Sequence, residues 1–480
     1  MTDHPRQIYL LNPKVLSQET IAVAFAKTSR SPESFKEIAS ELNDARSAEF
    51  NEKWVVGYGH ASVAEHAVLH IAIENVSRLA VEPIQSARLA SFTEKSTRYQ
   101  KWSSDAYHVP TELDELPDLR EIYLKTCKIL FETYQQILEP CKEVAARNCP
   151  RQDAESDGAY ERRLRSSYVD SCRFLLPAAS LANLGMTINA RSLEHLLSKL
   201  LSHPLQEVRR IGEEIKLTAQ DELPTLVKYA NRNPYLVDTP LKVTKHTQTI
   251  NSQIEDLDWC RLINYPEDGE DAILASLLYR YGNSSYADDL AAVKAMSLQQ
   301  KKQIYDDALS GMDRFDWPLR EMEHIHYSFD VSMDQGAYYE VKRHRMMTQS
   351  PQQLTCELGY AVPQLVEQAG CTDTYCRAMD QVYHSFQVIH DHLPEVASYL
   401  VPNGYLRRVL LTMNYREAFS FIQLRSAPNA HFSVRLIAKK MAEELCKVHP
   451  LLGSHLRANQ KIPWQTEADL VGKIIRPGQP

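Results

Sequence analysis

Two segments of the chain alternate apolar and polar residues with a period of two. They span residues 65–73 and residues 323–331. In the second segment one face is apolar and the other polar, with Ile325, Tyr327, Phe329 and Val331 opposite His326, Ser328 and Asp330. Because successive side chains of a strand point to opposite faces, each segment is predicted to be a half-buried strand.

Leucines recur at helical spacing behind an Asn-x-Arg triplet. The triplet Asn189-Ala190-Arg191 precedes Leu193, Leu196, Leu197, Leu200 and Leu201, whose spacing is typical of a core-facing helix. Arg191 and His195 are four residues apart on another face, so they could point at a common ligand. Asn414-Tyr415-Arg416 is a second such triplet, and we expect it to open a helix as well.

The order of these features is repeated along the chain. Each predicted strand is followed by a segment rich in Arg, Ser and Gln, residues 86–99 and 343–355, which we expect to be loops. Pro177 and Pro402 each lie twelve residues before the Asn of a triplet. We therefore predict one α+β unit used twice, as domains 1–240 and 241–480, with the boundary near residue 240 in the most loop-like region, 231–252.

Composition limits the classes of function. The chain has 480 residues, 44% hydrophobic and 24% charged, which is ordinary for a soluble globular protein. The formal net charge of −8 argues against a nucleic-acid binder but leaves room for a local basic site. We expect a cytoplasmic protein without a membrane span or signal peptide, because no long apolar run occurs and the nine cysteines are scattered. Cys371 and Cys376 lack a second pair at zinc spacing, so thiols are favoured over a metal site.

Several polar clusters are candidates for chemistry. Arg343-His344-Arg345 could hold a phosphate or diphosphate, although a solvated surface run is the commoner explanation of such a triplet alone. Ser96-Thr97-Arg98-Tyr99 pairs a hydroxyl with a guanidinium, and a structural loop is the default. His60, Ser62, Glu65 and His66 crowd the turn before the first strand, where a helix cap or a hydrogen-bond network is equally plausible. Neither Gly-x-Gly-x-x-Gly nor Gly-Lys-Ser/Thr occurs, so Rossmann and P-loop sites lack support.

In combination, these pieces resemble the flavin-dependent thymidylate synthases. That family carries Arg-His-Arg-x-x-Ser-x-Asn-x-x-Ser-x-Arg-Tyr, preceded by a His…Glu-His strand and followed by an Asn-x-Arg helix. The resemblance covers about residues 20–230 and 300–460 and is closer in the first half. It implies an α+β fold with two tandem copies of the family's domain, an antiparallel sheet with packed helices. It also implies reductive methylation of dUMP to dTMP, with methylenetetrahydrofolate as carbon donor, FAD as hydride carrier and NADPH as reductant.

The resemblance assigns roles to particular residues. The residues it implies for nucleotide binding are Glu94, Lys95, Ser96, Thr97, Arg98 and Arg173. Those it implies for the flavin cofactor are His60, Ser62, Asn189, Arg191, His195, Arg343, His344, Arg345, Asn414 and Arg416. Arg425 matches the catalytic arginine, which would stabilise negative charge developing on the pyrimidine.

The two halves depart from the family motif in complementary ways. The first half has Ser86-Ala87-Arg88 in place of Arg-His-Arg and Leu200 in place of the catalytic arginine. In the second half Gln353, Thr355 and Ser398 replace the counterparts of Ser96, Arg98 and Arg173. Because family sites combine different subunits, we expect Ser96, Arg98 and Arg173 to meet Arg425 at one composite site. The reciprocal combination would be dead, and a homodimer would form a pseudo-tetramer with two productive sites.

Other departures leave alternatives open. The family's Gln three residues before Arg-His-Arg is Pro83 in one half and Glu340 in the other, and its Asn is Thr93 and Ser350. A carboxylate beside a nucleotide phosphate is unfavourable, so a flavoenzyme acting on another pyrimidine nucleotide is one alternative. A non-catalytic nucleotide-binding or flavin-binding scaffold is the other, because motif loss after duplication also follows from relaxed constraint.

Overall fold

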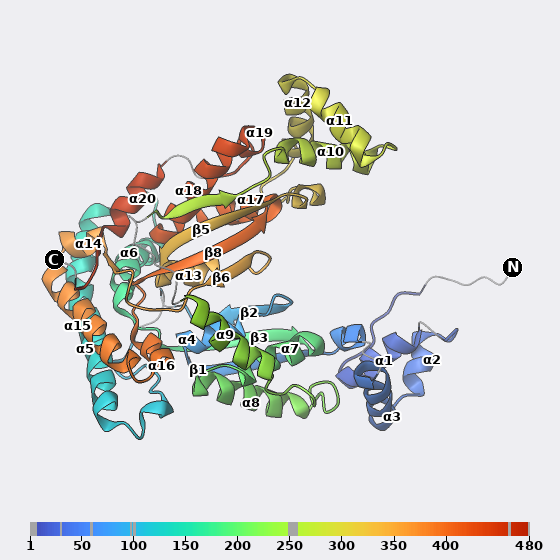
Figure 1. Ribbon diagram of the computed structural model, residues 1–480, viewed down its shortest axis with the longest axis horizontal. Helices are drawn as coiled ribbons and strands as arrows, with labels where there is room; N and C mark the ends of the chain where they lie inside the picture. Colours follow the sequence, from blue (N-terminus) through green and yellow to red (C-terminus); the bar gives the residue numbers. More distant parts are fainter. Residues whose placement is uncertain are drawn as a thin grey trace. The chain divides into compact units, whose positions relative to one another are not determined.

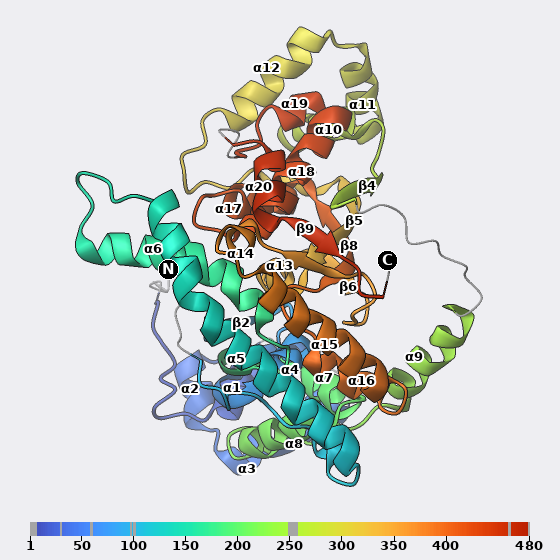
Figure 2. The ribbon, with the colours of Figure 1, turned by 90° about the vertical axis from the view of Figure 1, so that its left-hand side faces the viewer.

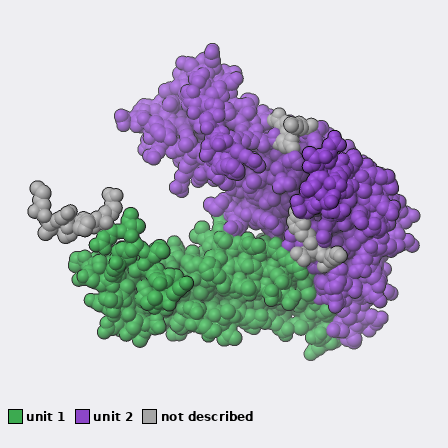
Figure 3. Space-filling model, turned by 180° about the vertical axis from the view of Figure 1, so that it is seen from behind, with its two compact units in different colours: residues 1–95, 108–115, 181–252 green, residues 96–107, 116–180, 253–480 purple. Residues whose placement is uncertain are grey.

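The computed structural model describes residues 7–28, 31–57, 61–96, 98, 102–247, 258–458 and 462–478 (Figure 1). Helices surround small antiparallel sheets, which confirms the predicted α+β class. The chain divides into two compact units, coloured separately in Figure 3. Unit 1 comprises residues 1–95, 108–115 and 181–252, and unit 2 comprises residues 96–107, 116–180 and 253–480.

Unit 1 is built on a three-stranded antiparallel sheet in the order β1-β3-β2, formed by β1 (Val68–Ser77), β3 (Leu181–Asn189) and β2 (Ala90–Glu94). Alternate side chains of β3 are buried, namely Ala182, Leu184, Met186 and Ile188. They pack against α4 (Arg78–Ile84) and α7 (Ala190–Leu201), and α7 contacts α8 (Gln206–Gln220). The opposite face of the sheet has a shallow hollow of about 330 Å³ that includes His70, Ser91 and Thr187.

The other elements of unit 1 are mostly short helices. They are α1 (Gln18–Thr28), α2 (Phe35–Ser40), α3 (Asp44–Phe50), the π-helical η1 (Asn51–Gly57), the 3₁₀-helical η2 (Ala61–His66) and η3 (Thr111–Leu113), and α9 (Pro234–Thr247). None of the residues of α9 is buried. Residues 231–252 therefore hold a helix where a loop is expected from the sequence, and the absence of a buried face explains why no apolar periodicity indicates it.

Unit 2 contains a four-stranded antiparallel sheet in the order β4-β5-β8-β6, formed by β4 (Cys260–Asn264), β5 (His326–Asp334), β8 (Leu406–Asn414) and β6 (Thr348–Pro351). The apolar face of β5 is fully buried, with Tyr327, Phe329, Val331 and Met333 in the core. Helices α13 (Gln335–Val341), α17 (Tyr415–Arg425) and α18 (Phe432–Val448) pack against this sheet (Figure 1).

The remaining elements of unit 2 extend this core. They are α5 (Pro117–Asn148), α6 (Asp157–Cys172), η4 (Arg173–Leu175), α10 (Gly269–Tyr281), α11 (Tyr286–Ala295), α12 (Leu298–Leu309), η5 (Arg320–Glu323), α14 (Gln364–Gln368), α15 (Thr372–His390), α16 (Pro394–Ala397), η6 (Ser398–Leu400), α19 (Pro450–Gly453), α20 (Trp464–Val471) and the strand pair β7 (Tyr360–Val362) with β9 (Lys473–Ile475). No helix within the described ranges is long and apolar enough to cross a membrane.

The element order of the first half recurs in the second. The series η2-β1-α4-β2 and then η4-β3-α7-α8 corresponds to η5-β5-α13-β6 and then η6-β8-α17-α18. Both predicted strands are confirmed, although each begins three residues later than expected, and both helices after the Asn-x-Arg triplets are confirmed. Residues 86–99 and 343–355 each contain a short strand, β2 or β6, where loops are expected. Their hydrogen-bonding partners, β3 and β8, lie far along the chain, so local sequence gives little sign of them.

Within unit 2, the two halves of the sequence meet around Pro177 and Pro402, which form an antiparallel bridge. Two pairs of backbone hydrogen bonds flank it: Ala178 N to Val401 O (2.9 Å) with Asn403 N to Leu176 O (3.0 Å), and Ala179 N to Tyr399 O (2.8 Å) with Gly404 N to Phe174 O (2.9 Å). When Pro177 is matched with Pro402, the bonds of each pair exchange. Such reciprocity is a property of a twofold contact between identical subunits, so the halves contact each other as two such subunits would.

Helices from the two halves also pack together in unit 2. Helix α5 lies beside α15 (Figure 2), and Thr126 Oγ1 donates to Ser385 Oγ at 2.7 Å between them. The close approach at the junction requires a glycine. A Cβ at Gly404 would lie 2.8 Å from Tyr375 Oη and 3.1 Å from Phe174 Cβ. Helices α5 and α6 of the first half are thus part of unit 2.

Candidate functional site

Three arginines that are distant in the sequence come together in unit 2. Arg98 follows β2, Arg173 begins η4 and Arg425 ends α17. Two carboxylates connect them, Asp170 from the last turn of α6 and Glu340 from α13. We call this row of five alternating charges the arginine network. It brings together both predicted nucleotide-binding arginines and the predicted catalytic arginine.

Arg98 joins Asp170 in a two-pronged ion pair. Its Nε lies 2.8 Å from Oδ1 and its Nη2 lies 2.7 Å from Oδ2 of the carboxylate. Arg98 Nη1 also donates to the carbonyl oxygen of Asn429, a second-half residue, at 2.9 Å. The backbone N–H of Arg98 donates to Ser96 Oγ at 3.2 Å. Such bidentate, charge-assisted bonds fix both groups in one orientation.

Arg173 lies between the two carboxylates and is only 4% exposed. Its Nε lies 3.6 Å from Asp170 Oδ1, and its Nη2 lies 3.9 Å from Glu340 Oε1. Burial raises the pKa of Asp170, and the charges of Arg173 and Arg98 oppose this rise. The backbone carbonyl of Arg173 accepts a hydrogen bond from Asn403 Nδ2 at 2.9 Å, so the second half helps to hold this residue.

Arg425 is held by Glu340 and His344. Its Nη1 lies 3.1 Å from Glu340 Oε2, and its Nε donates to His344 Nε2 at 2.9 Å. An arginine N–H can only donate, so His344 Nε2 is the acceptor and Nδ1 carries the proton. That proton faces Glu417 Oε1 at 3.1 Å. Burial lowers the pKa of His344, which favours this neutral form.

The three residues of the Arg-His-Arg motif face different surroundings. His344 is 8% exposed and is committed to Arg425 and Glu417. Arg343 is exposed, and its Nε donates to the carbonyl of Tyr339 at 3.2 Å. Arg345 is partly buried, which lowers its pKa. Arg343 is thus the residue of the motif whose side chain is most exposed at the surface.

The two Asn-x-Arg triplets make the same contacts in their respective units. Asn189 Oδ1 accepts from Ser192 N at 2.9 Å and caps α7, and Asn414 Oδ1 accepts from Glu417 N at 2.8 Å and caps α17. Arg191 pairs with Glu65. In the second half Arg416 pairs with Glu323 at 2.7 Å and donates to the carbonyl of Pro318 at 2.9 Å. These residues therefore have structural partners that account for their repetition.

Other predicted site residues belong to unit 1. Glu94 lies 3.1 Å from Arg78 and accepts from Gln85 Nε2 at 3.2 Å. The backbone N–H of Lys95 donates to Asn183 O at 2.9 Å, and its side chain is exposed. Ser62 is exposed on η2, and partial burial lowers the pKa of His195 on α7. His60 and Thr97 lie outside the described residues.

The sequence did not single out several partners of the network. Asp170 precedes Arg173 by one helical turn, a spacing that could have indicated it. Glu417 follows the second Asn-x-Arg triplet directly. The buried His431 accepts from Ser433 N through Nδ1 at 3.3 Å, and its Nε2 lies 3.2 Å from Asp170 O. The contacts of His431 and Asn429 join distant segments, so sequence spacing gives no sign of them.

The counterparts of the network residues have other roles. Leu200 is fully buried in α7 and packs closely against α8, where a Cβ on Gly212 would lie 2.9 Å from its Cβ. Ser398 Oγ donates to Leu354 O at 2.8 Å. Gln353, the counterpart of Ser96 beside the network, has its Nε2 3.3 Å from Glu395 Oε2. None of these three residues has a positively charged side chain.

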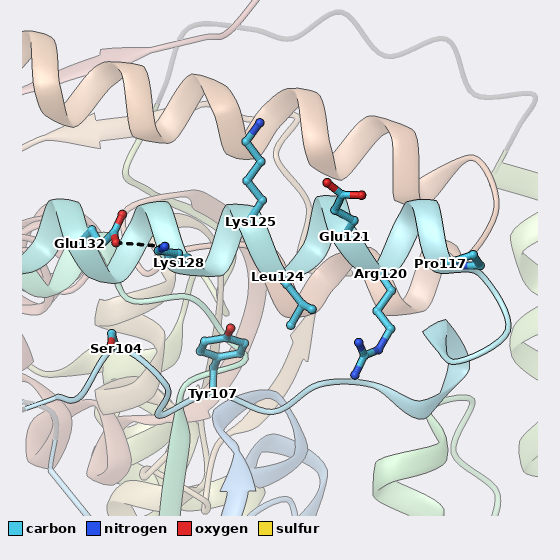
Figure 4. A pocket seen from close by; sticks show the side chains of 9 residues that line it. All are labelled: Ser104, Tyr107, Pro117, Arg120, Glu121, Leu124, Lys125, Lys128 and Glu132. Atoms are coloured by element: carbon cyan, nitrogen blue, oxygen red, sulfur yellow. Dashed lines mark ion pairs between the residues drawn. The ribbon is translucent and has the colours of Figure 1, made fainter.

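A separate groove of about 590 Å³ lies along α5 (Figure 4). Arg120 and Lys125 line it together with Glu121 and Tyr107, and Lys128 pairs with Glu132 at 3.7 Å. No residue of the arginine network lines this groove. Among the described residues, no three His, Cys, Asp or Glu side chains gather as a metal site, and all nine cysteines are free.

Comparison with known proteins identifies the family. The family described as "Thymidylate synthase complementing protein" matches residues 13–225 and 261–451, one segment in each half. The chain belongs to this family, which confirms the resemblance to the flavin-dependent thymidylate synthases seen in the sequence.

Relatives match either most of the chain or one half of it. A UPF0159 protein of Chlamydia muridarum is 31% identical over 433 residues, covering 87% of this chain and 82% of that protein. A flavin-dependent thymidylate synthase of Clostridium tetani is 25% identical over 213 residues, covering 44% of this chain and 82% of the relative. A crystal structure of the Helicobacter pylori flavin-dependent thymidylate synthase with FAD and dUMP is 18% identical, covers 42% of this chain and 99% of that one, and gives a TM-score of 0.32.

Proposed function

We propose that the protein is a flavin-dependent methyltransferase that converts dUMP to dTMP at one composite site per chain. The observation that supports this most directly is the arginine network, in which first-half Arg98 and Arg173 join second-half Arg425. The pattern of losses agrees, because Thr355, Ser398 and Leu200 stand at the counterparts of these three arginines. Family membership supports this class of reaction.

The network suits a small anionic substrate. Arg98 and Arg173 hold the nucleotide, and their burial strengthens attraction to an anion because the local dielectric is low. Arg425 faces the pyrimidine, where its positive charge stabilises the negative charge that develops during attack by uracil C5. His344 keeps the Arg425 guanidinium oriented through its neutral Nε2. FAD, when bound, would supply the hydride and methylenetetrahydrofolate the carbon, and we propose that Arg343 contacts the flavin diphosphate.

The assembly that we propose follows from the twofold contact at Pro177 and Pro402. One chain carries two family domains, 1–240 and 241–480, so it corresponds to a pair of single-domain subunits. A homodimer would then be a pseudo-tetramer with two productive sites instead of four. NADPH is the proposed reductant of the flavin.

A different pyrimidine nucleotide is the second candidate substrate. Glu340 supports it, because this carboxylate contacts both Arg173 and Arg425 where the family has a neutral Gln. A non-catalytic scaffold is the third candidate, since the carboxylates within the network already balance most of the arginine charge.

The purified protein tests the proposal through its spectrum and its turnover. We expect flavin absorption and formation of dTMP from dUMP, methylenetetrahydrofolate and NADPH. Arg425→Ala should lower turnover by about 10²- to 10³-fold, because the group that stabilises the developing charge is lost. Arg163→Ala, at an ion pair with Glu155, is the matched control and should leave turnover unchanged.

The outcomes separate the three candidates. An Arg425→Ala protein with full activity would contradict the composite site. Bound flavin without dTMP formation would favour another nucleotide. A colourless protein without nucleotide affinity would favour the scaffold.

A further inference from the structure

We propose that the Glu340 carboxylate competes with the anionic group of the ligand for the arginines of the network. This competition determines how strongly the site prefers a phosphorylated ligand to a neutral one. This inference rests on the proposed nucleotide site. It concerns affinity and specificity, so it can be tested without turnover.

The geometry places the Glu340 carboxylate between two guanidiniums. Its Oε2 lies 3.1 Å from Arg425 Nη1, and its Oε1 lies 3.9 Å from Arg173 Nη2. The residue is 9% exposed, so water screens these charges weakly. A ligand phosphate held by Arg173 would therefore share this cation with the Glu340 carboxylate, and the two anionic groups would lie close together.

The charge balance of the network shows what this competition costs. Three arginines face the carboxylates of Asp170 and Glu340, which leaves one net positive charge, and His344 is neutral. A phosphate monoester dianion would turn this into one net negative charge. With Gln at position 340 the network starts with two positive charges, and the same dianion neutralises it. Because uncompensated buried charge is unfavourable, the wild-type site resists the dianion more than the Gln variant does.

Asp170 does not compete in the same way. Both of its oxygens are engaged by Arg98 at 2.8 and 2.7 Å, so this pair is already matched within the first half. Glu340 instead contacts one arginine from each half. It is thus the carboxylate of the network that acts on both sides of the composite site.

Comparison of equivalent positions in the two halves shows that the acidic residue occurs together with the three arginines. Its counterpart in the first half is Pro83, inside α4. The counterparts of Arg98, Arg173 and Arg425 are likewise uncharged. The acid is therefore present only in the combination that has the cations, as expected if it tunes their charge.

The test compares wild type, Glu340→Gln and Glu367→Gln as full-length proteins. Glu367 pairs with the exposed Lys473 at 2.6 Å, so its variant removes the same charge away from the network. Affinities for dUMP, inorganic phosphate and 2′-deoxyuridine are measured by isothermal titration calorimetry. Glu340→Gln should bind dUMP about ten- to a hundredfold more tightly than wild type, because a like-charge contact is removed. Its affinity for 2′-deoxyuridine should not change, and Glu367→Gln should behave as wild type.

Equal or weaker dUMP binding by Glu340→Gln overturns the proposal, as does an equal gain for 2′-deoxyuridine or no anion binding at all. If Glu340→Gln does not fold, wild type decides: a dUMP preference over 2′-deoxyuridine below about a hundredfold supports the competition, and a larger preference contradicts it. The proposed function fails separately. A tighter Glu340→Gln site in a protein that makes no dTMP refutes the reaction and leaves the competition standing.

Discussion

At the scale of single residues, the guanidinium of Arg425 is held by two groups that differ in charge. Glu340 pairs with one nitrogen at 3.1 Å, and the neutral His344 accepts from another at 2.9 Å. A neutral acceptor fixes orientation and leaves the positive charge available. A carboxylate fixes orientation and offsets the charge. We therefore expect His344 to set the orientation of the Arg425 guanidinium and Glu340 to set how much of its positive charge is available to the substrate.

Asp334 gives a prediction for pH dependence, because it caps α13, the helix that carries Glu340. Its Oδ1 accepts from Ala337 N at 2.8 Å, and complete burial raises its pKa from 3.8 to about 6. Since the folded-state pKa is the higher one, the unfolded chain ionises first as the pH rises. The proton's contribution to stability is complete below about pH 4 and is lost above about pH 6, a change of about 3 kcal/mol.

Asp334→Asn keeps the capping oxygen without the charge. The melting temperature of the variant minus that of wild type should therefore be higher at pH 8 than at pH 5. Thermal denaturation at the two pH values would measure this difference. The same difference between variant and wild type at both pH values would mean that Asp334 does not titrate between them.

Sequence reasoning reached the three arginines of the network but few of their partners. Complementary motif losses indicated that Arg98 and Arg173 belong with Arg425. The inward orientation of His344 could not be read from Arg-His-Arg, because it depends on Glu417 and Arg425 from another segment. Asn429 and His431 were missed for the same reason.

At the scale of elements, three residues on one face of α17 contact the side chain of His344. Glu417, Phe421 and Arg425 are spaced at intervals of four residues and so share a helix face. Glu417 and Arg425 contact the two ring nitrogens. The Phe421 ring packs edge-to-face against the imidazole, with 4.9 Å between the ring centroids. The corresponding positions in α7 are Ser192, Leu196 and Leu200, of which the two leucines are buried in the core. The equivalent helix face thus contributes to the arginine network and its His344 contact in the second half, and to the hydrophobic core in the first half.

The start of α17 sets this register, and Asn414 caps it. Asn414→Ala should lower stability by about 1 kcal/mol, because the amide of Glu417 loses its acceptor. Calorimetric melting temperatures would measure the loss. Asn414→Asp keeps an acceptor and should melt close to wild type. If Asn414→Asp is as unstable as Asn414→Ala, the side chain has a role other than the cap.

Periodicity predicted the elements that bury one face. It gave β1 and β5 through alternation and α7 through its leucines. It missed β2 and β6, which are short edge strands with few apolar residues, and α9, which buries none of its side chains. Elements without a buried stripe leave no periodic signal in the sequence.

At the scale of the whole molecule, the sequence halves and the compact units differ. The halves meet through reciprocal hydrogen bonds around Pro177 and Pro402, and α5 and α6 of the first half belong to unit 2. The arginine network lies in that unit, so residues of both halves contribute to it. Duplication followed by loss of one of two equivalent residue sets would produce such an arrangement, with one site per chain.

The number of nucleotides bound per chain tests this account most directly. Titration of the purified protein with dUMP, followed by calorimetry, should give one equivalent per chain. Arg173→Ala should abolish this binding, because the arginine at the centre of the network is lost, and Ser398→Ala at its counterpart should leave the stoichiometry at one. Two equivalents per chain, or unchanged binding by Arg173→Ala, would contradict the composite site.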